Sequence, residues 1–261
     1  MHHVVQGLWI GGTLSPIEVL CIRSFQHHGH EFHLYAYGPL KNVPDGTVLK
    51  DANEILPESA IFRARQGHLS AFADFFRWTL LAKHGGLWVD MDMVCLRPFD
   101  FADDIVFGLE SEDTVNNAVL GFPAGHFMAT VMMKACDDVN LFQPIDSTKA
   151  KVKKVLRRTL LGKEKSRRYT RFTEPGGPVY FTKFLRHYGL FHLAKPVHWF
   201  YPIPMRKWPS VFAPNSEAEH AVEGSYAVHL WNNAIDCDPY LDKSNPQREG
   251  TLFGKLAKRY L

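Results

Sequence analysis

The sequence predicts one α/β domain over residues 1–261, built on a Rossmann-like mixed sheet with helices on both faces. Strand-like and helix-like segments alternate in the N-terminal third, a pattern typical of mostly parallel sheets covered by helices. The chain has 261 residues, of which 46% are hydrophobic. This is enough to bury the core of a single enzyme domain.

The first expected helix has the clearest boundaries. Ser15 and Glu18 form a capping box, with Pro16 at the first helical position. Gly29 ends this helix. The expected elements of the N-terminal third are a strand at 4–10, the helix at 15–28, strands at 32–37 and 47–50, a helix at 69–83 and a strand that ends at Asp90.

Later segments continue the sheet and its helices. Their patterns predict strands at 105–109, 118–122 and 226–230, and helices at 125–139 and 178–187. In sheets of this class, ligands bind at the carboxyl ends of the strands. Trp9 and Asp90 both follow or end expected strands, so we expect both at that edge.

Residues 85–92 read Gly-Gly-Leu-Trp-Val-Asp-Met-Asp and carry the first chemical signal. In an extended chain, Asp90 and Asp92 point to the same side, where they repel each other unless a cation or a donor lies between them. Mg²⁺ and Mn²⁺ favour oxygen ligands and often bridge to phosphate. The pair therefore suggests a metal–phosphate site, although a bare Asp-x-Asp also occurs by chance in surface loops.

The expected helix at 69–83 strengthens this interpretation. The helix is mostly apolar, which implies burial. Ser70, Asp74 and Arg77 interrupt it at positions that form one stripe. The stripe could be an exposed face with an ordinary Asp–Arg pair. Because buried charges need partners, a stripe that faces a polar cleft beside the Asp-x-Asp explains both features better.

These residues resemble a known family. Ser70-x3-Asp74-x2-Arg77 followed by Gly85-Gly86-x-Trp88-x-Asp90-x-Asp92 is similar to the signature of the DXD sugar-transfer proteins. That group contains glycosyltransferase family 32, the α-1,4-galactosyltransferases and the glucosylating clostridial toxins. Weaker similarities lie on both sides of this block and occur in the family's order, at residues 7–12, 116–118, 177–178 and 229–232. The resemblance implies a GT-A type nucleotide-sugar-binding fold.

The resemblance also implies an activity. A hexose would move from a UDP-sugar to a saccharide acceptor of a capsule, lipopolysaccharide or glycolipid, with Mn²⁺ or Mg²⁺ bound. The new bond would keep the donor's α configuration. The departing phosphate would accept the acceptor's proton, which fits the absence of a clear nucleophile–base pair in the sequence.

Individual roles follow from the same resemblance. Asp92 would ligate the metal, and Asp90 would contact ribose, sugar or metal-bound water. Asp74 and Arg77 match residues that bind sugar hydroxyls; with the two motif aspartates they form the expected catalytic set. Trp88 stands where Tyr is more usual. Trp9 would stack on uracil, and His229 would also complete the metal shell. Asn117 or its neighbour Asn116 would contact the sugar or acceptor. The expected donor-binding residues are Trp9, Ile10, Gly11, Ser70, Asp74, Arg77, Asp90, Met91, Asn117, His229 and Trp231.

Each role has an alternative. Trp9 could be a core residue, and His229 and Trp231 could be structural groups at the end of a strand. Glu110, Glu112, Asp113 or Asp238 could include an acceptor-side base. A haloacid-dehalogenase-like phosphatase also places Asp-x-Asp after an apolar strand, but its motif normally continues with Thr or Gly, and Met93 follows here. A non-catalytic carbohydrate-binding relative is the remaining alternative.

Residues 149–171 stand apart in charge, within an expected insertion at about 145–172. Eleven Lys or Arg and one acid give this segment a charge of +10; because the whole chain carries +3, the remainder carries −7. Val152, Val155, Leu156, Leu160 and Leu161 supply an apolar stripe. A basic amphipathic helix suits an anionic membrane surface, and a solvated excursion is the alternative. No nucleic-acid-binding motif accompanies the segment, so we expect no nucleic acid partner.

The remaining features concern compartment. The four cysteines, Cys21, Cys95, Cys136 and Cys237, lack metal-type spacing and are typical of free thiols. No signal peptide or membrane-spanning run is evident. The expectation is a bacterial cytoplasmic protein, peripheral on the inner membrane face. A segment of a longer, membrane-anchored protein would have the same features.

Overall fold

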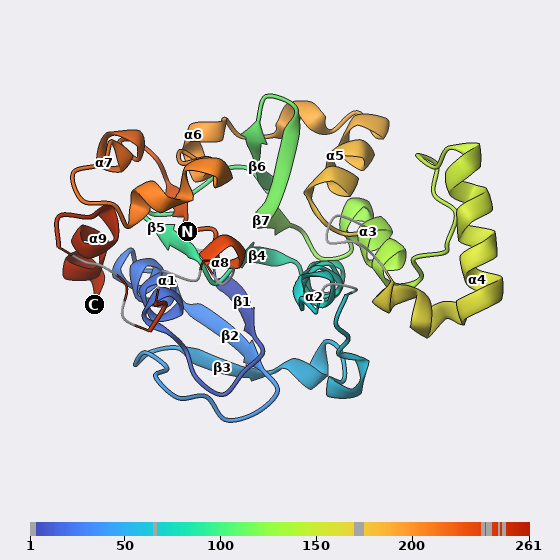
Figure 1. The fold of residues 1–261 in the computed structure, drawn as a ribbon, viewed down its shortest axis with the longest axis horizontal. Coiled ribbons are helices and arrows are strands. Elements are labelled where there is room, and N and C mark those ends of the chain that lie inside the picture. The colour runs from blue at the N-terminus through green and yellow to red at the C-terminus, as the bar shows by residue number, and fades with distance from the viewer. Residues whose placement is uncertain are drawn as a thin grey trace.

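A computed structural model describes residues 4–64, 67–169, 175–235, 238, 242–244, 246 and 249–261 (Figure 1). Its main sheet has the strand order β3-β2-β1-β4-β7-β6. These strands are β1 (Val5–Trp9), β2 (Phe32–Ala36), β3 (Val48–Asp51), β4 (Gly86–Val89), β6 (Val106–Ser111) and β7 (Thr114–Phe122). Strands β1 to β4 run parallel, whereas β7 is antiparallel to both β4 and β6. The predicted mixed sheet is confirmed.

Helices cover both faces of this sheet, as predicted. Helix α1 (Pro16–His27) begins with the expected capping box. It packs with one set of strand residues that includes Val5 and Val89. Helix α2 (Ser70–His84) packs with the opposite set, which includes Trp88. The two sets lie on opposite faces because successive strand residues alternate. Helices α3 (Phe127–Asp137) and α5 (Pro178–His187) extend the α2 side.

A second, two-stranded sheet was only half predicted. Strand β8 (Ala227–His229) was expected, but its antiparallel partner β5 (Met93–Cys95) was not, because three buried residues offer no alternating pattern. Helix α9 (Leu252–Tyr260) was not predicted either and packs over this sheet. The shorter helices are α6 (Val197–Phe200), α7 (Ala218–Ala221) and α8 (Asn232–Ile235), with 3₁₀ turns at 52–54, 58–60, 191–193 and 205–211.

The basic segment forms helix α4 (Thr148–Arg168), which kinks at Gly162, where φ is 68°. The predicted basic helix is therefore present, and it lies at the edge of the molecule beyond α3 (Figure 1). Arg171, the last basic residue of the segment, lies outside the described residues, as does Cys237. Among the described helices, none has the length and apolar character needed to cross a membrane.

Candidate functional site

A cavity of about 690 Å³ opens at the carboxyl ends of β1 and β4. It gathers residues from distant stretches of chain, which include the end of β1, the segment that leads into α2 and its first turns, the Asp-x-Asp turn, strands β6 and β7, the start of α5, and the segment from β8 into α8. The predicted site residues that line it are Trp9, Ile10, Ser70, Asp74, Arg77, Asp90, Met91, Asp92, Asn117, His229 and Trp231.

Gly11, also predicted to contact the donor, is not among the lining residues, and its contact with the donor stays a prediction. It is exposed beyond the end of β1. A Cβ atom added to it would lie 3.2 Å from Trp9 Nε1. Gly11 therefore lies beside the indole of Trp9.

Asp90 lies where β4 ends. Its backbone N–H donates to the carbonyl of Ala118 on β7 at 2.8 Å, which fixes the turn. Its carboxylate Oδ1 accepts from Trp88 Nε1 at 2.8 Å and pairs with Arg77 Nη1 at 2.9 Å. Trp88 stands where the family that this sequence resembles more often has Tyr. Its buried indole N–H donates a hydrogen bond to the motif's first carboxylate. Asp90 is therefore held facing the α2 stripe.

The stripe on α2 is buried, so the alternative of an exposed Asp–Arg pair is wrong. Asp74 and Arg77 are only 6% and 5% exposed. Asp74 Oδ1 accepts from Asn117 Nδ2 at 2.8 Å and lies 3.4 Å from Arg77 Nε. Arg77 Nη1 also donates to the Asn117 carbonyl at 2.5 Å. Helix α2 and strand β7 thus present one connected polar wall.

Burial has an electrostatic cost at this wall. Desolvation raises the pKa of Asp74 to about 6, with the charge of Asp90 adding to the rise and Arg77 and Asn117 opposing it. Desolvation lowers the pKa of Arg77, but the carboxylates of Asp90 and Asp74 outweigh it, and the net pKa is raised. Ser70, one turn before Asp74, has a buried hydroxyl without a hydrogen-bond partner among the described residues. A polar ligand in the cavity could satisfy it.

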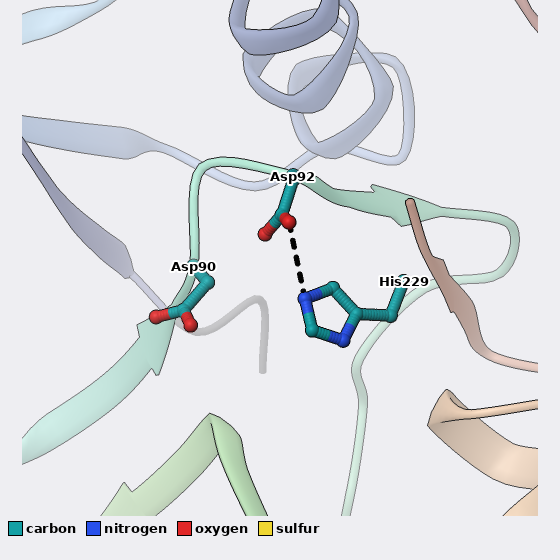
Figure 2. A group of neighbouring side chains, drawn as sticks. All are labelled: Asp90, Asp92 and His229. Atoms are coloured by element: carbon teal, nitrogen blue, oxygen red, sulfur yellow. Dashed lines mark ion pairs between the residues drawn. The ribbon is translucent and has the colours of Figure 1, made fainter. Parts of the chain in front are cut away.

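Asp92 is brought to His229 by the small sheet. Met93 pairs with His229 across β5 and β8, and Leu230 N–H donates to the Asp92 carbonyl at 2.9 Å. As a result, His229 Nε2 lies 3.1 Å from Asp92 Oδ2 (Figure 2). The same oxygen accepts from the backbone N–H of Asn232 at 2.6 Å.

The two groups of this pair shift each other's pKa. Burial raises the pKa of Asp92, but the positive charge and hydrogen bond of His229 outweigh it, and the net pKa is lowered. Burial lowers the pKa of His229, whereas the charge and hydrogen bond of Asp92 raise it, and the net pKa is raised. The pair therefore favours carboxylate and imidazolium when no cation is bound.

Asp90, Asp92 and His229 fit a divalent metal ion. One ligand atom from each lies within 4.8 Å of the others. Figure 2 shows Asp92 and His229 facing each other from the Asp-x-Asp turn and β8, with the Asp90 side chain nearby on the same turn. Two carboxylates and an imidazole are a donor set that suits Mn²⁺ as well as Mg²⁺. His229 Nδ1 is buried without a partner among the described residues, so packing against Trp231 at 4.0 Å and Tyr201 at 5.8 Å orients the ring.

The aromatic residues differ in exposure. Trp9 is half-buried, donates from Nε1 to the Thr13 carbonyl at 3.1 Å, and has Lys243 Nζ 5.2 Å from its ring. Trp231 is 6% exposed and donates from Nε1 to the Ile203 carbonyl at 2.8 Å. Its φ of 61° is a left-handed conformation, uncommon for a bulky residue. Both tryptophans line the cavity; Trp9 is half-buried there, whereas Trp231 is buried and packs against His229.

Several residues at the site were not predicted from the sequence. Glu18 is fully buried; its Oε1 accepts from Lys243 Nζ at 2.8 Å and from Asn232 Nδ2 at 3.0 Å. Glu18 thereby supports the segment whose backbone binds Asp92. Only its role as a capping residue was visible in the sequence, because the other contacts join distant parts of the chain. Arg63 and His68 also line the cavity and gave no sequence signal.

The acceptor-side candidates separate in the structure. Glu110 lines the cavity, and its Oε2 accepts from Asn116 Nδ2 at 2.7 Å. Glu112 and Asp113 are exposed at the β6–β7 turn and do not line it. Asp238 does not line it either. Of the four, Glu110 is the one that lines the cavity.

Two family models match the chain. The model described as "Glycosyltransferase sugar-binding region containing DXD motif" matches residues 45–108, which hold the α2 stripe and the Asp-x-Asp. The model described as "Alpha 1,4-glycosyltransferase conserved region" matches residues 186–260, which hold His229 and Trp231. The chain is a glycosyltransferase. The predicted resemblance is confirmed, and the two matched regions of this glycosyltransferase meet at its cavity.

Two further comparisons were made. Among solved structures, the glycosyltransferase is similar to the PaToxG glycosyltransferase, at 12% identity and a TM-score of 0.48, over 71% of this chain and 68% of that chain. The comparison with curated proteins found no match. The six-stranded mixed sheet, with the Asp-x-Asp directly after a central strand, is consistent with the GT-A type fold.

Proposed function

We propose that this glycosyltransferase transfers a hexose from a UDP-sugar to a saccharide acceptor with the help of a divalent cation. The main support is the meeting, in one cavity, of three metal-type ligand atoms and the buried wall of Asp74, Arg77 and Asn117. The ligand atoms would bind the metal ion, and the polar wall beside them would bind the hydroxyl groups of the donor's sugar. Burial raises the pKa of the Asp74 carboxyl to about 6, which makes its charged form less stable. Such perturbed groups are common at ligand-binding sites.

In this proposal, Asp92, Asp90 and His229 hold Mn²⁺ or Mg²⁺. The cation would neutralise the charge that develops on the leaving diphosphate. Arg77 already pairs with Asp90 and so keeps that carboxylate in place beside the donor. The Asn232 N–H donates to Asp92 Oδ2 and so holds this carboxylate in place.

The donor's base and sugar would occupy opposite parts of the cavity. The half-buried face of Trp9 offers a flat apolar surface for uracil, and Ile10 and Met91 lie beside it in the lining. Asp74, Arg77, Ser70 and Asn117 would bind sugar hydroxyls. The buried hydroxyl of Ser70 has no partner among the described residues, which favours this role.

We propose a retaining reaction in which no protein carboxylate attacks the sugar. Among the described lining residues, the carboxylates are Asp74, Asp90, Asp92 and Glu110. The first is bound to Asn117, and the next two are assigned to the metal and donor. Glu110 remains, and we assign it to the acceptor side, where a saccharide hydroxyl could approach it. A lipid-linked acceptor would be reached at a membrane surface; nucleic acid has no role in this proposal.

One assay separates this proposal from its rivals. The protein is incubated with Mn²⁺ and a panel of UDP-sugars, and UDP release is followed. Slow, metal-dependent hydrolysis of one donor supports the transferase and names its sugar. Release of phosphate from simple phosphate esters, without UDP release, favours the phosphatase. Saccharide binding without turnover of any donor favours the non-catalytic relative.

A further inference from the structure

Helix α4 exposes a row of apolar side chains. Val152, Val155, Leu156 and Leu160 are between 50% and 78% exposed. They are spaced three and four residues apart, so they lie together on one face of the helix. Single exposed apolar residues are common on protein surfaces, but a continuous row marks an interaction site.

Basic residues border this row on both sides. At about 100° per residue around the helix axis, Lys153 falls along one edge, with Lys149 one turn before it at the start of the row, and Lys151 and Arg158 fall along the other edge. All four are exposed. Within the described part of the chain, no ion pair is seen for any of them. Their charges are therefore available to a partner.

The opposite face of α4 attaches the helix to the rest of the protein. Lys154 Nζ pairs with Asp146 Oδ2 at 2.7 Å and donates to the Leu141 carbonyl at 2.9 Å. Arg157 donates to Asn140 Oδ1 at 2.7 Å, and beyond the kink Arg167 pairs with Asp137 at 2.5 Å. These contacts fix the helix so that its apolar row faces away from α3, at the edge seen in Figure 1.

We infer that this face of α4 binds an anionic lipid membrane. An apolar row between two rows of cations is the pattern of a helix that lies in the membrane interface, with its apolar side chains at the acyl boundary and its cations at the headgroup phosphates. The charge distribution supports the same partner. The segment at 149–171 carries +10 and the rest of the chain −7, so an anionic surface attracts α4 and repels the remainder.

Charge also argues against a second copy of this chain on the same face. Two α4 helices packed through their apolar rows would bring two strongly positive segments together. Nucleic acid would attract the cations but would leave the apolar row exposed to water. An anionic membrane would contact both the cations and the apolar row. The binding rests on α4 alone; only its purpose, access to a lipid-linked acceptor, rests on the proposed function.

Vesicle flotation with the full chain tests this inference. The vesicles contain phosphatidylcholine either alone or with about one third phosphatidylglycerol, and no donor or metal is added. We expect binding only to the anionic vesicles, weakened roughly tenfold in about 0.5 M NaCl. The charge variant K149E/K153E and the apolar variant L156S/L160S should each lower the partition coefficient by roughly tenfold.

A matched control and a turnover assay complete the test. K41E/K258E makes the same charge change at two exposed lysines away from α4 and should bind like the wild type. All variants should release UDP in solution at the wild-type rate, because α4 is remote from the cavity lining. Equal binding to neutral and anionic vesicles would overturn the inference, as would dimers that both α4 variants disrupt. Vesicle binding without donor turnover would refute the proposed function and leave this inference intact.

Discussion

His229 Nε2 lies 3.1 Å from Asp92 Oδ2, across the antiparallel pair of β5 and β8. This contact joins the two regions that match glycosyltransferase family models, one before residue 108 and one after residue 186. Both side chains are buried. The motif's second carboxylate therefore has a fixed partner from the far end of the chain, and a cation at this position would replace a proton-mediated contact.

The first prediction concerns that competition between proton and cation. Because Asp92 raises the pKa of His229, the imidazole holds its proton more firmly than a free histidine does, and a metal must displace it. Mn²⁺ affinity should therefore rise as the pH is raised from about 6 to about 8. His229→Gln should weaken Mn²⁺ binding by roughly tenfold and flatten this pH dependence. Isothermal titration calorimetry measures both, and an unchanged pH profile in the variant would contradict the assignment.

The second prediction uses the buried carboxylate of Asp74. Its folded-state pKa of about 6 lies above the ordinary value of 3.8, so the folded protein binds this proton more tightly than the unfolded chain. The resulting stability is fully present below about pH 4 and is lost as the pH rises through 6, about 3 kcal/mol in all. Asp74→Asn lacks this titration.

Urea denaturation at several pH values measures the effect. The free energy of unfolding of Asp74→Asn minus that of the wild type should increase between about pH 4.5 and pH 7.5, whatever the offset at the lower pH. A difference that does not change with pH would show that Asp74 ionises normally. Donor turnover should fall in the same variant, because the amide is neutral and offers one acceptor oxygen to sugar hydroxyls where the carboxylate offers two.

The third prediction concerns Glu18, which accepts a hydrogen bond from Asn232, the residue whose backbone N–H binds Asp92. Glu18→Gln leaves Lys243 without its buried anion and should lower the free energy of unfolding by about 2 kcal/mol. Glu219→Gln is the matched control, since its ion pair with Lys255 is partly exposed to solvent and its loss should cost under about 1 kcal/mol. The Glu18 variant should also lower Mn²⁺ affinity through Asn232. Equal stability of the two variants would remove Glu18 from this role.

The fourth prediction concerns Trp9. If uracil stacks on its exposed face, Trp9→Ala should raise the KM for the UDP-sugar roughly tenfold, while Trp9→Phe should keep part of the affinity because a smaller ring remains. Steady-state kinetics and direct UDP binding measure both. A KM unchanged in Trp9→Ala would make the indole a structural residue held by Thr13.

The sequence could predict the local parts of this structure. Helix α5 has the predicted bounds, the Ser15 capping box is present, and the Ser70–Asp74–Arg77 stripe faces the cavity because helical spacing decides it. Strand β5 and helix α9 were missed because they are stabilised by contacts with distant segments rather than by a pattern of their own. Gly11 was assigned to the site from its position in a motif, and it lies beside Trp9 at the turn after β1.

The same distinction applies to the site. The identities of Asp90, Asp92 and His229 could be predicted from the sequence. The sequence could not predict that Arg77 pairs with Asp90 as well as with Asp74. Nor could the second contact of Glu18 be read, since one carboxylate oxygen serves the helix cap and the other reaches Asn232. Such choices depend on which side chains the fold brings together.

The central claim is that Asp92 holds a divalent cation for UDP-sugar turnover. The most direct measurement compares Mn²⁺ binding and Mn²⁺-dependent UDP release in the wild type and in Asp92→Asn. This variant keeps the size of the side chain and its acceptor for the Asn232 N–H. We predict that the variant folds, with a melting temperature lowered by the lost ion pair with His229. It should lose measurable Mn²⁺ binding, and its UDP release should fall roughly 100-fold or more. Near wild-type UDP release from a folded Asp92→Asn variant would contradict the account.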